Sequence, residues 1–386
     1  MGLKRSSVQK TTLGAALMLN AVLSLTSQKL DFLNQVSVWF SLNDARPSTP
    51  RFGLRYIPSL SLIKPIGNNL SVDGEVSANA YASGQASGWK NLSADGRIKP
   101  YRLWLRMSTP RFEARLGIQK INFGSSAILR PLMWFDRIDP RDPLQITDGV
   151  TAVLLRYYFP GNANIWAWGL YGNDDLKGWE SSPTARRSPE FGGRVQIPLF
   201  HGELGLTYHH RRADLSRGLV YEIALRDPIV PEDRFAMDGK WDIGIGIWAE
   251  GALIHQQNEN LTYPYQRLLN IGADYTFAIG SGLHLLVEHL VQRSGRSAWG
   301  NGSGGDFTAL MTSCPLGLLD SLSGIFFYDW KNRDVFNFLS WRRTYDHWQF
   351  FIIGFLNPES GRIIQAVQGN NFFGGKGFQV MAVLNY

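Results

Sequence analysis

Residues 101–119 read YRLWLRMSTPRFEARLGIQ, which is two alternating runs separated by a short turn. Apolar residues occupy every second position of both runs: Tyr101, Leu103, Leu105, Met107, Phe112, Ala114, Leu116 and Ile118. Polar or small residues, arginine above all, stand between most of them. A period of two is that of a β-strand, whose successive side chains point to opposite faces. The segment therefore predicts a hairpin with one apolar and one mainly polar face.

The same period recurs along the chain in runs of about ten residues, the length that a tilted strand needs to cross a bilayer. Globular strands average about half that length. The expected strands are 36–43, 51–63, 70–82, 99–108, 111–121, 150–159, 163–172, 190–198, 202–211, 233–240, 243–255, 265–278, 282–292, 306–313, 323–331, 334–342, 347–356 and 377–386. This makes eighteen, with sixteen as the alternative count.

The connections between these runs alternate in length. Short turns are expected at Lys64–Asn69, Ser108–Arg111, Pro160–Asn162, Leu199–Gly202, Ala278–Gly282 and Arg342–His347. Longer polar loops are expected near 83–98, 122–149, 173–189, 212–232, 294–305 and 357–375. Short turns at one end and long loops at the other are typical of outer-membrane barrels.

Composition excludes several other classes. The chain of 386 residues has 13 Trp, 14 Tyr, 22 Phe and 40 Gly, but only 18% charged residues, against about 25% in soluble domains. No run of about 20 apolar residues follows the N-terminus, which excludes a helical membrane protein. The ring content excludes a disordered chain, and the single cysteine, Cys314, excludes a disulfide scaffold.

These observations predict an all-β protein, a transmembrane antiparallel up-and-down β-barrel. In hydrocarbon every backbone N–H and C=O needs a partner, and closure into a barrel removes the unpaired edge of a sheet. The expected inward residues are polar or small rather than bulky and aliphatic. A soluble β-sandwich is the alternative, but it would need the reverse arrangement, with apolar residues inside.

Residues 1–27 have the layout of a secretory signal peptide. Lys4, Arg5 and Lys10 precede an apolar core, and small polar residues follow it. A buried N-terminal helix is the alternative. The segment holds three basic and no acidic residues, so its removal would lower the formal charge from +7 to +4. Residues 28–386 would form the barrel, and a nucleic-acid partner is poorly supported.

The last residues form an alternating run that stops on an aromatic residue. This run resembles the C-terminal signature of Gram-negative outer-membrane proteins. The resemblance implies that the barrel-insertion machinery recognises these residues. The residues that carry the expected insertion signal are Phe378, Val380, Leu384 and Tyr386. The resemblance implies export to the cell outer membrane, with membrane lipid and lipopolysaccharide as surroundings.

Alternation also separates the side chains expected to line the lumen. The basic set is Arg102, Arg106, Arg115, Arg156, Arg194 and Arg211, and the acidic set is Glu250, Asp274 and Glu288. If the strands follow one another around the ring, these sets form a basic wall and an acidic wall, with a transverse field that filters solutes by charge. Alternatively, the arginines pair with neighbouring carboxylates such as Glu113 and Glu203.

The loop 122–149 is unusually apolar for an exposed connection, so we expect it to fold back into the barrel and constrict the pore. Its candidate constriction residues are Arg130, Trp134, Asp136, Arg137, Asp139, Arg141 and Asp142. The alternative is an external cap packed on its own apolar residues. A calcium site formed by three of the aspartates is a third hypothesis, although their spacing differs from that of an EF-hand.

A further resemblance rests on residues of this region: Arg115-Leu-Gly117-Ile-Gln119, Asn122-Phe123-Gly124, Trp134, Asp148-Gly149 and Leu155-Arg156-Tyr157. In this order they resemble the strand–loop–strand segment of alginate-export-type and related substrate-selective porins, and they depart from it at Ile118, where the pattern has Arg. The resemblance implies an eighteen-stranded barrel whose arginines pass anionic sugars or small anions. The segment Trp166-Ala-Trp168-Gly-Leu-Tyr171 is similar to uncharacterised barrels of the Bacteroidota.

The expected function is therefore a porin for passive diffusion of small hydrophilic, mainly anionic, solutes. No catalytic motif, metal-ligand spacing or cofactor motif occurs, so we expect no enzyme and no cofactor. One alternative is a structural or accessory subunit of a secretion or assembly complex. Another is a hydrolase active at the barrel rim, with His255, His284, His289 and Asp274 as its candidate residues. A homo-oligomer or an accessory protein partner fits either membrane role.

Overall fold

The computed structural model describes residues 29–44, 50–87, 91–218, 227–258, 260–358 and 373–386. These residues form eighteen β-strands and one short 3₁₀ helix, η1 (Leu215–Arg217). None of the described helical residues belongs to a helix long and apolar enough to cross a membrane. The expected signal segment 1–27 and most of the expected loop 357–375 lie outside the described residues.

The strands follow one another along the chain with these bounds: β1 (Lys29–Asn43), β2 (Arg51–Ile66), β3 (Leu70–Ser87), β4 (Asn91–Ser108), β5 (Phe112–Gln119), β6 (Val150–Tyr158), β7 (Asn164–Tyr171), β8 (Pro189–Leu199), β9 (Gly202–Asp214), β10 (Ile229–Asp242), β11 (Gly246–Gln256), β12 (Tyr265–Phe277), β13 (Leu283–Gly295), β14 (Gly302–Pro315), β15 (Asp320–Asp329), β16 (Asp334–Thr344), β17 (Trp348–Leu356) and β18 (Lys376–Asn385).

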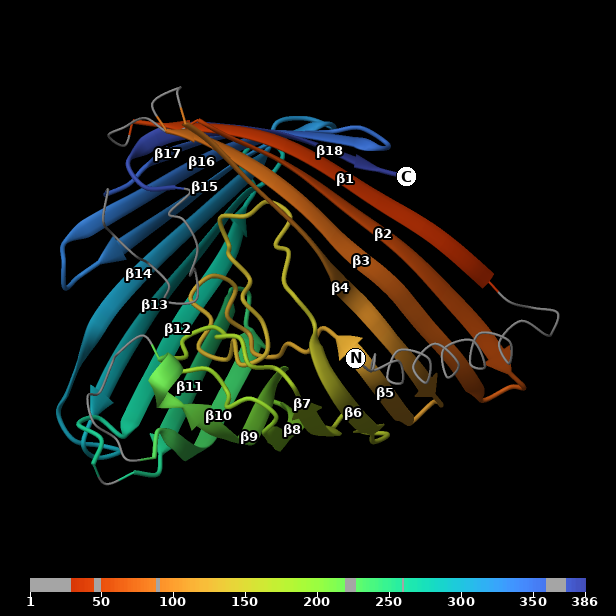
Figure 1. Ribbon diagram of the computed structural model, residues 1–386, viewed down its shortest axis with the longest axis vertical. Helices are drawn as coiled ribbons and strands as arrows, with labels where there is room; N and C mark the ends of the chain where they lie inside the picture. The colour runs from red at the N-terminus through yellow and green to blue at the C-terminus, as the bar shows by residue number, and fades with distance from the viewer. Residues whose placement is uncertain (1–28, 45–49, 88–90, 219–226, 259, 359–372) are drawn as a thin grey trace, which may run out of the picture.

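Every strand pairs antiparallel with its neighbours in the chain, and β18 pairs with β1, which closes the ring (Figure 1). The closing register places Val38 opposite Ala382. The predicted fold class and the count of eighteen are confirmed, and the alternatives of sixteen strands and of a β-sandwich are wrong. The start of β1 and the end of β18 lie at the edge of the barrel that carries the short turns.

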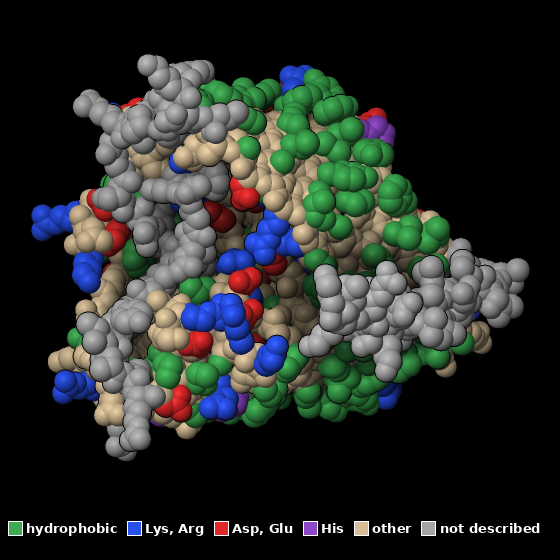
Figure 2. All heavy atoms as spheres, viewed as in Figure 1, with side chains coloured by type: hydrophobic (Ala, Val, Ile, Leu, Met, Phe, Trp, Pro, Cys, Tyr) green, Lys and Arg blue, Asp and Glu red, His purple; other side chains and the backbone are tan. Residues whose placement is uncertain are grey.

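The alternation predicted for residues 101–119 is present on β4 and β5. Leu103 and Leu105 are 50% and 48% exposed on the outer face. The neighbouring Arg102 points to the inner face and is 8% exposed. Figure 2 shows hydrophobic side chains spread over the outer face of the strands, with charged side chains gathered in the hollow. A chain whose outer wall is apolar and whose charges face inward reverses the soluble pattern, as a membrane barrel requires.

Tyr101 departs from the predicted outward set. The register between β3 and β4 shifts between Ser77 and Ala78, which places an extra residue on β4. A bulge of this kind re-aims a side chain. The Tyr101 ring therefore lies beside the inward Arg102, with the guanidinium carbon 3.9 Å from its centroid.

Several expected boundaries also shift. β1 begins at Lys29 rather than at residue 36, and β3 and β4 run through most of the loop expected at 83–98. That stretch is rich in Ser, Ala and Gly, which reads locally as a loop, but ladder pairing such as Gly84 with Ala94 keeps it extended. The turn between β10 and β11 lies at 243–245 rather than in the expected gap 241–242, and the turn between β14 and β15 lies at 316–319, within the expected gap 314–322.

Exposed aromatic rings collect near both edges of the barrel. At the short-turn edge they are Tyr157, Phe159, Phe200, Tyr275, Phe277, Tyr345, Trp348, Phe350 and Tyr386. At the opposite edge they include Phe40, Phe52, Tyr171, Phe191, Trp330 and Phe378. Aromatic residues form girdles at the two membrane–water interfaces of such barrels, and Tyr and Trp are favoured there because each ring has an apolar body and a polar end. The exposed part of the aromatic excess thus gathers where a bilayer would begin and end.

Candidate functional site

The connection between β5 and β6, residues 120–149, runs inside the ring of strands, and we name it the inner loop (Figure 1). Its central side chains are almost completely buried: Ile128, Leu129, Leu132, Met133, Trp134 and Phe135 are each at most 4% exposed. A loop this apolar can be buried only if its backbone polar groups find partners. Those partners come from strands on the far side of the ring.

Two glutamates of the opposite wall hold the inner loop by its backbone. The Glu288 carboxylate on β13 accepts the N–H groups of Ala127 and Leu129, each at 2.6 Å, and that of Ile128 at 3.1 Å. Glu250 on β11 accepts the N–H of Ser126 at 2.6 Å. These two residues, predicted to line an acidic wall, therefore bind the backbone of the inner loop.

An apolar core lies between the inner loop and the walls of the barrel. The Phe123 ring stacks on Trp168 at 5.7 Å, and Phe135 meets the His209 ring edge-on at 5.1 Å. Inward residues of β10 to β16 continue this core, among them Trp248, Ile254, Leu268, Leu286, Leu290, Phe327 and Phe338. The expectation of a polar or small interior is wrong on this side, because the inner loop covers these residues and keeps them dry.

The charged residues of the inner loop pair with one another. Arg130 forms two parallel bonds to the Asp136 carboxylate, at 2.9 and 3.1 Å, and both side chains are buried. Arg141 binds Asp139 at 2.8 Å. Asp142 accepts the N–H of Leu144 at 3.0 Å, and burial raises the pKa of its carboxyl group. Among the described residues no three carboxylate, His or Cys side chains gather as metal ligands.

The remaining two members of the predicted loop set are Arg137 and Trp134. Arg137 reaches Asp148 at 3.4 Å, and Lys99 on β4 binds the same carboxylate at 2.5 Å. Burial opposes ionisation of Asp148, but these two cations hold its pKa below the usual value. Trp134 lies with its ring edge against Phe123 in the core, 5.7 Å away. The end of the inner loop is thus tied to β4.

Three predicted arginines converge on one carboxylate at the inner face of β4, β5 and β6. Glu113 lies 3.1 Å from Arg115, 3.7 Å from Arg106 and 3.7 Å from Arg156. Arg106 also pairs with Asp73 on β3. The register places Arg106 directly opposite Arg115, a like-charge pair that is unfavourable by itself. We name this group the basic cluster, and its cations outnumber its carboxylates.

Aromatic rings support the guanidinium groups of this wall. The Arg156 guanidinium lies 3.9 Å from the centre of the Trp166 ring, and Arg115 lies 4.7 Å from that of Trp104. Within the described residues the buried Nε–H groups of Arg115 and Arg156 have no hydrogen-bond acceptor, and neither does the Trp166 indole N–H. These donors and the partial exposure of the cluster make it a candidate anion-binding surface. The described part of the wall continues with Arg55, stacked near Trp39 and Tyr81.

Arg102 and Arg194, two further predicted basic residues, are buried and bound to other parts of the barrel. Arg102 donates to the Thr147 carbonyl at 3.1 Å, which fixes the end of the inner loop. Arg194 on β8 binds Asp238 on β10 through both terminal nitrogens, and both side chains are at most 3% exposed. These two arginines hold the loop and the wall together.

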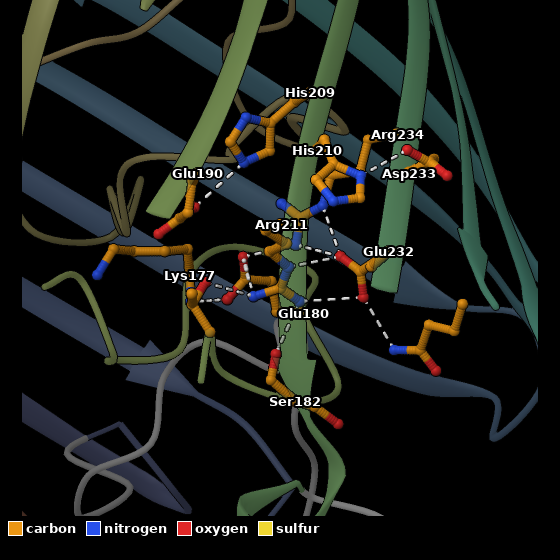
Figure 3. Close-up of polar contacts among 12 residues, drawn as sticks. Lys177, Glu180, Ser182, Glu190, His209, His210, Arg211, Glu232, Asp233 and Arg234 are labelled. Atoms are coloured by element: carbon orange, nitrogen blue, oxygen red, sulfur yellow. Dashed lines mark hydrogen bonds and ion pairs between the residues drawn. The ribbon is translucent and has the colours of Figure 1, made fainter. Parts of the chain in front are cut away.

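Arg211 belongs to a buried quartet that joins β9, β10 and the segment 172–188 between β7 and β8 (Figure 3). Arg211 binds Glu232 at 2.6 Å and Glu180 at 3.1 Å. Arg234 binds the same two carboxylates, at 2.7 and 2.8 Å. All four residues are at most 7% exposed, so each charge is paired where an unpaired charge would be costly.

The quartet was only partly visible in the sequence. Glu232, Asp233 and Arg234 are three consecutive charged residues, so charge alternation cannot assign them to a face. In the structure Glu232 and Arg234 face inward, and Asp233 faces outward, where it binds His210 at 2.8 Å. Glu180 lies in a loop with no period at all. Strand pairing was the signal needed to assign Glu232 and Arg234 to the inner face, and no sequence pattern marks Glu180.

The candidate residues for hydrolysis are divided between the two faces of the wall. His284 and Asp274 face inward, 3.3 Å apart, whereas His289 is bonded to Thr308 on the outer face and His255 stacks on Tyr265. They do not form one site.

His209 and Glu190 form a separate buried pair, with the ring nitrogen 3.1 Å from the carboxylate. Trp168 donates its indole N–H to the other ring nitrogen, Nδ1, at 3.2 Å, so the proton on the neutral ring lies on Nε2 and is donated to Glu190. Phe135 and Trp134 cover the ring, which is 0% exposed. This pair fastens β8 to β9 beneath the inner loop.

No protein-family model matches the chain, and no curated protein matches it. Among solved structures, OccAB2 of Acinetobacter baumannii is similar with 7% identity and a TM-score of 0.56, over 93% of this chain and 98% of that one. OccK7 (OpdD) of Pseudomonas aeruginosa is similar with 9% identity and a TM-score of 0.53, over 94% and 99%.

OmpT, an outer membrane protein of Vibrio cholerae in its trimer form, is similar with 13% identity and a TM-score of 0.51, over 94% of this chain and 100% of that one. Identities this low establish the fold alone. The chain therefore has the fold of the outer-membrane β-barrel porins, here as a closed ring of eighteen antiparallel strands.

Proposed function

We propose that the protein is an outer-membrane channel through which small hydrophilic anions diffuse. The observation that carries the proposal is the basic cluster. Its three arginines share Glu113 on the inner wall and remain partly exposed, with Arg106 at 32%, Arg115 at 16% and Arg156 at 17%. A low-dielectric wall with an excess of one sign of charge raises the local concentration of the opposite ion.

The inner loop supports this proposal because it divides the interior. It packs against the inward faces of β10 to β16, so that side of the ring is filled by an apolar core. The wall formed by β2 to β6 keeps polar, half-buried side chains instead, among them Arg55, Glu75 and Arg106. We propose that solutes pass along this wall and that the inner loop is the constriction, where Arg137 is the most exposed arginine of the loop.

Several other expectations belong to the same proposal. The outward apolar band supports contact with membrane lipid and lipopolysaccharide. We include in the proposal export by the signal segment and recognition of Phe378 to Tyr386 by the insertion machinery. The resemblance to alginate-export-type porins would make anionic sugars the solutes, and its residues Arg115 and Arg156 both lie in the basic cluster. An origin in the Bacteroidota and a homo-oligomeric state are also part of this proposal.

Planar-bilayer recording with the full chain tests the proposal. In a KCl gradient the reversal potential should show that chloride is more permeant than potassium. Arg115→Gln and Arg156→Gln should each lower this selectivity, because each removes one cation from the cluster. Arg212→Gln is the matched control, since Arg212 is exposed on the outer face beside the buried Arg211. Potassium selectivity in the unmodified protein would overturn the proposal.

A structural or accessory barrel is the second candidate, and the apolar core around the inner loop favours it. Residues such as Leu129, Leu154 and Leu290 are completely buried within the ring, as expected for a plug. This candidate predicts no conductance from correctly folded, inserted protein, together with stable co-purifying partners. Anion-selective conductance would exclude it.

A further inference from the structure

A pocket of about 160 Å³ lies near the loop edge of the barrel, beside the quartet shown in Figure 3. The segment 172–188 closes one side of it, and the ends of β9 to β13 form most of the rest. Apolar side chains complete the lining: Leu215 of η1, Ile254 of β11, and Leu261 and Pro264 of the connection between β11 and β12. It faces a different part of the interior from the basic cluster, which belongs to β4, β5 and β6. The proposed anion path does not use this pocket.

The floor of the pocket is electrically balanced. Arg211 donates to Glu232 at 2.6 Å, to the Thr184 hydroxyl at 3.1 Å and to the Ser182 carbonyl at 2.8 Å. Arg234 donates to Glu232 and Glu180, each at 2.8 Å. Two arginines and two glutamates neutralise one another, so the floor offers no unpaired counter-charge to a charged ligand.

The wall of the pocket presents neutral amide and hydroxyl groups from three adjacent strands. Gln256 of β11, Gln266 of β12, and Gln292 and Ser294 of β13 line it. The Gln256 amide also donates to Glu232 at 2.9 Å, and the Gln266 amide to the Trp179 carbonyl at 3.4 Å. Gln266 pairs across the ladder with Ser294, which places both on the same inner face. An amide carries both donors and acceptors, and a hydroxyl does the same. At the rim stands Tyr263, 50% exposed.

We infer that this pocket binds an uncharged, polyhydroxylated group, such as one sugar unit or a polyol. Each hydroxyl of such a ligand can both donate and accept, which matches the wall of glutamines and serine. An ionised ligand would lose its hydration without gaining a partner of opposite charge. The volume is below the roughly 300–1,000 Å³ of pockets for drug-sized ligands, so the ligand is a small unit. The Tyr263 ring offers an apolar face to the C–H groups of the ligand.

Ligand-observed NMR on the detergent-solubilised full chain tests the inference with D-glucose and sorbitol as neutral probes and D-glucuronate as the charged one. The neutral probes should show saturable binding, and glucuronate should bind more weakly. Gln292→Ala and Ser294→Ala should each weaken the binding of D-glucose by about fivefold to tenfold, the effect of one lost hydrogen bond. Gln349→Ala is the matched control, because Gln349 faces inward at the opposite edge.

Absence of saturable binding, or an unchanged affinity in both pocket variants with unchanged thermal unfolding, overturns the inference. Tighter binding of glucuronate that is lost in Arg115→Gln also overturns it and assigns the ligand to the basic cluster. If one pocket variant fails to fold, the other one decides. Because binding is read without conductance, failure here is distinguishable from failure of the proposed channel.

Discussion

Replacing Glu288 by glutamine should release the inner loop from the wall. One carboxylate oxygen accepts the N–H of Ala127 and the Trp248 indole N–H, and the other accepts the N–H groups of Ile128 and Leu129. An amide has only one acceptor oxygen, and its NH₂ group would face N–H donors. In either orientation two buried donors lose their acceptor.

The magnitude follows from that count. Each buried donor left without an acceptor costs about 1–3 kcal/mol, so Glu288→Gln should weaken the docked inner loop by about 2–6 kcal/mol. The lower cost of burying a neutral group offsets part of this, and about 2 kcal/mol should remain. Because 1.4 kcal/mol corresponds to a factor of ten, local opening should become about 30-fold more frequent.

Amide hydrogen exchange of residues 126–129 in detergent measures this opening, and single-channel recording measures its effect on the pore. We expect exchange at least tenfold faster and a larger, noisier conductance. Asp274→Asn is the control, because Asp274 also faces inward on the neighbouring strand but its partner is His284. Unchanged exchange at Ala127 and Leu129 in a folded variant would refute the idea that Glu288 holds the inner loop.

Three further predictions concern other parts of the molecule. Gly124→Ala should lower the melting temperature, because φ at this position is +96° and the new Cβ would lie 2.5 Å from Glu250 Oε1. The displaced inner loop should also increase the conductance, and unchanged values of both would contradict this. Asp148 has a lowered pKa and binds Lys99, so its stabilisation is complete above about pH 4 and is lost as the pH falls further. Asp148→Asn should therefore lower the melting temperature at pH 6, and the difference from the unmodified protein should shrink as the pH falls below about 4; a difference that stays constant would contradict this. Ile271→Arg, at the middle of the outer face, should cost about 2–4 kcal/mol in urea unfolding from lipid vesicles, and a cost near zero would refute the assigned face.

The eighteen strands could be predicted because the period of two belongs to the backbone and because a bilayer demands one apolar face everywhere. Leu103, Arg102 and Glu113 are placed by that rule alone. Several strand ends differ from the predicted ones, because ladder pairing rather than composition determines them. The Ser- and Gly-rich end of β3 is extended only because β4 pairs with it.

The interior could not be predicted to the same extent. Alternation states which side chains point inward, but not which of them meet across the ring. That Glu288 would bind the backbone of the inner loop, or that Arg194 would find Asp238, depends on contacts between residues far apart in the sequence. The bulge that turns Tyr101 also leaves no mark on a period of two. These contacts require the closed ring to be known first.

Cysteine accessibility during single-channel recording tests most directly whether solutes pass beside the basic cluster. In a Cys314→Ser background, Arg115→Cys should react with a negatively charged thiol reagent, and the anion current should fall. Ala309→Cys should remain unreactive, because Ala309 is completely buried beneath the inner loop. Current reduction through position 309 without any effect at position 115 would contradict the proposed path.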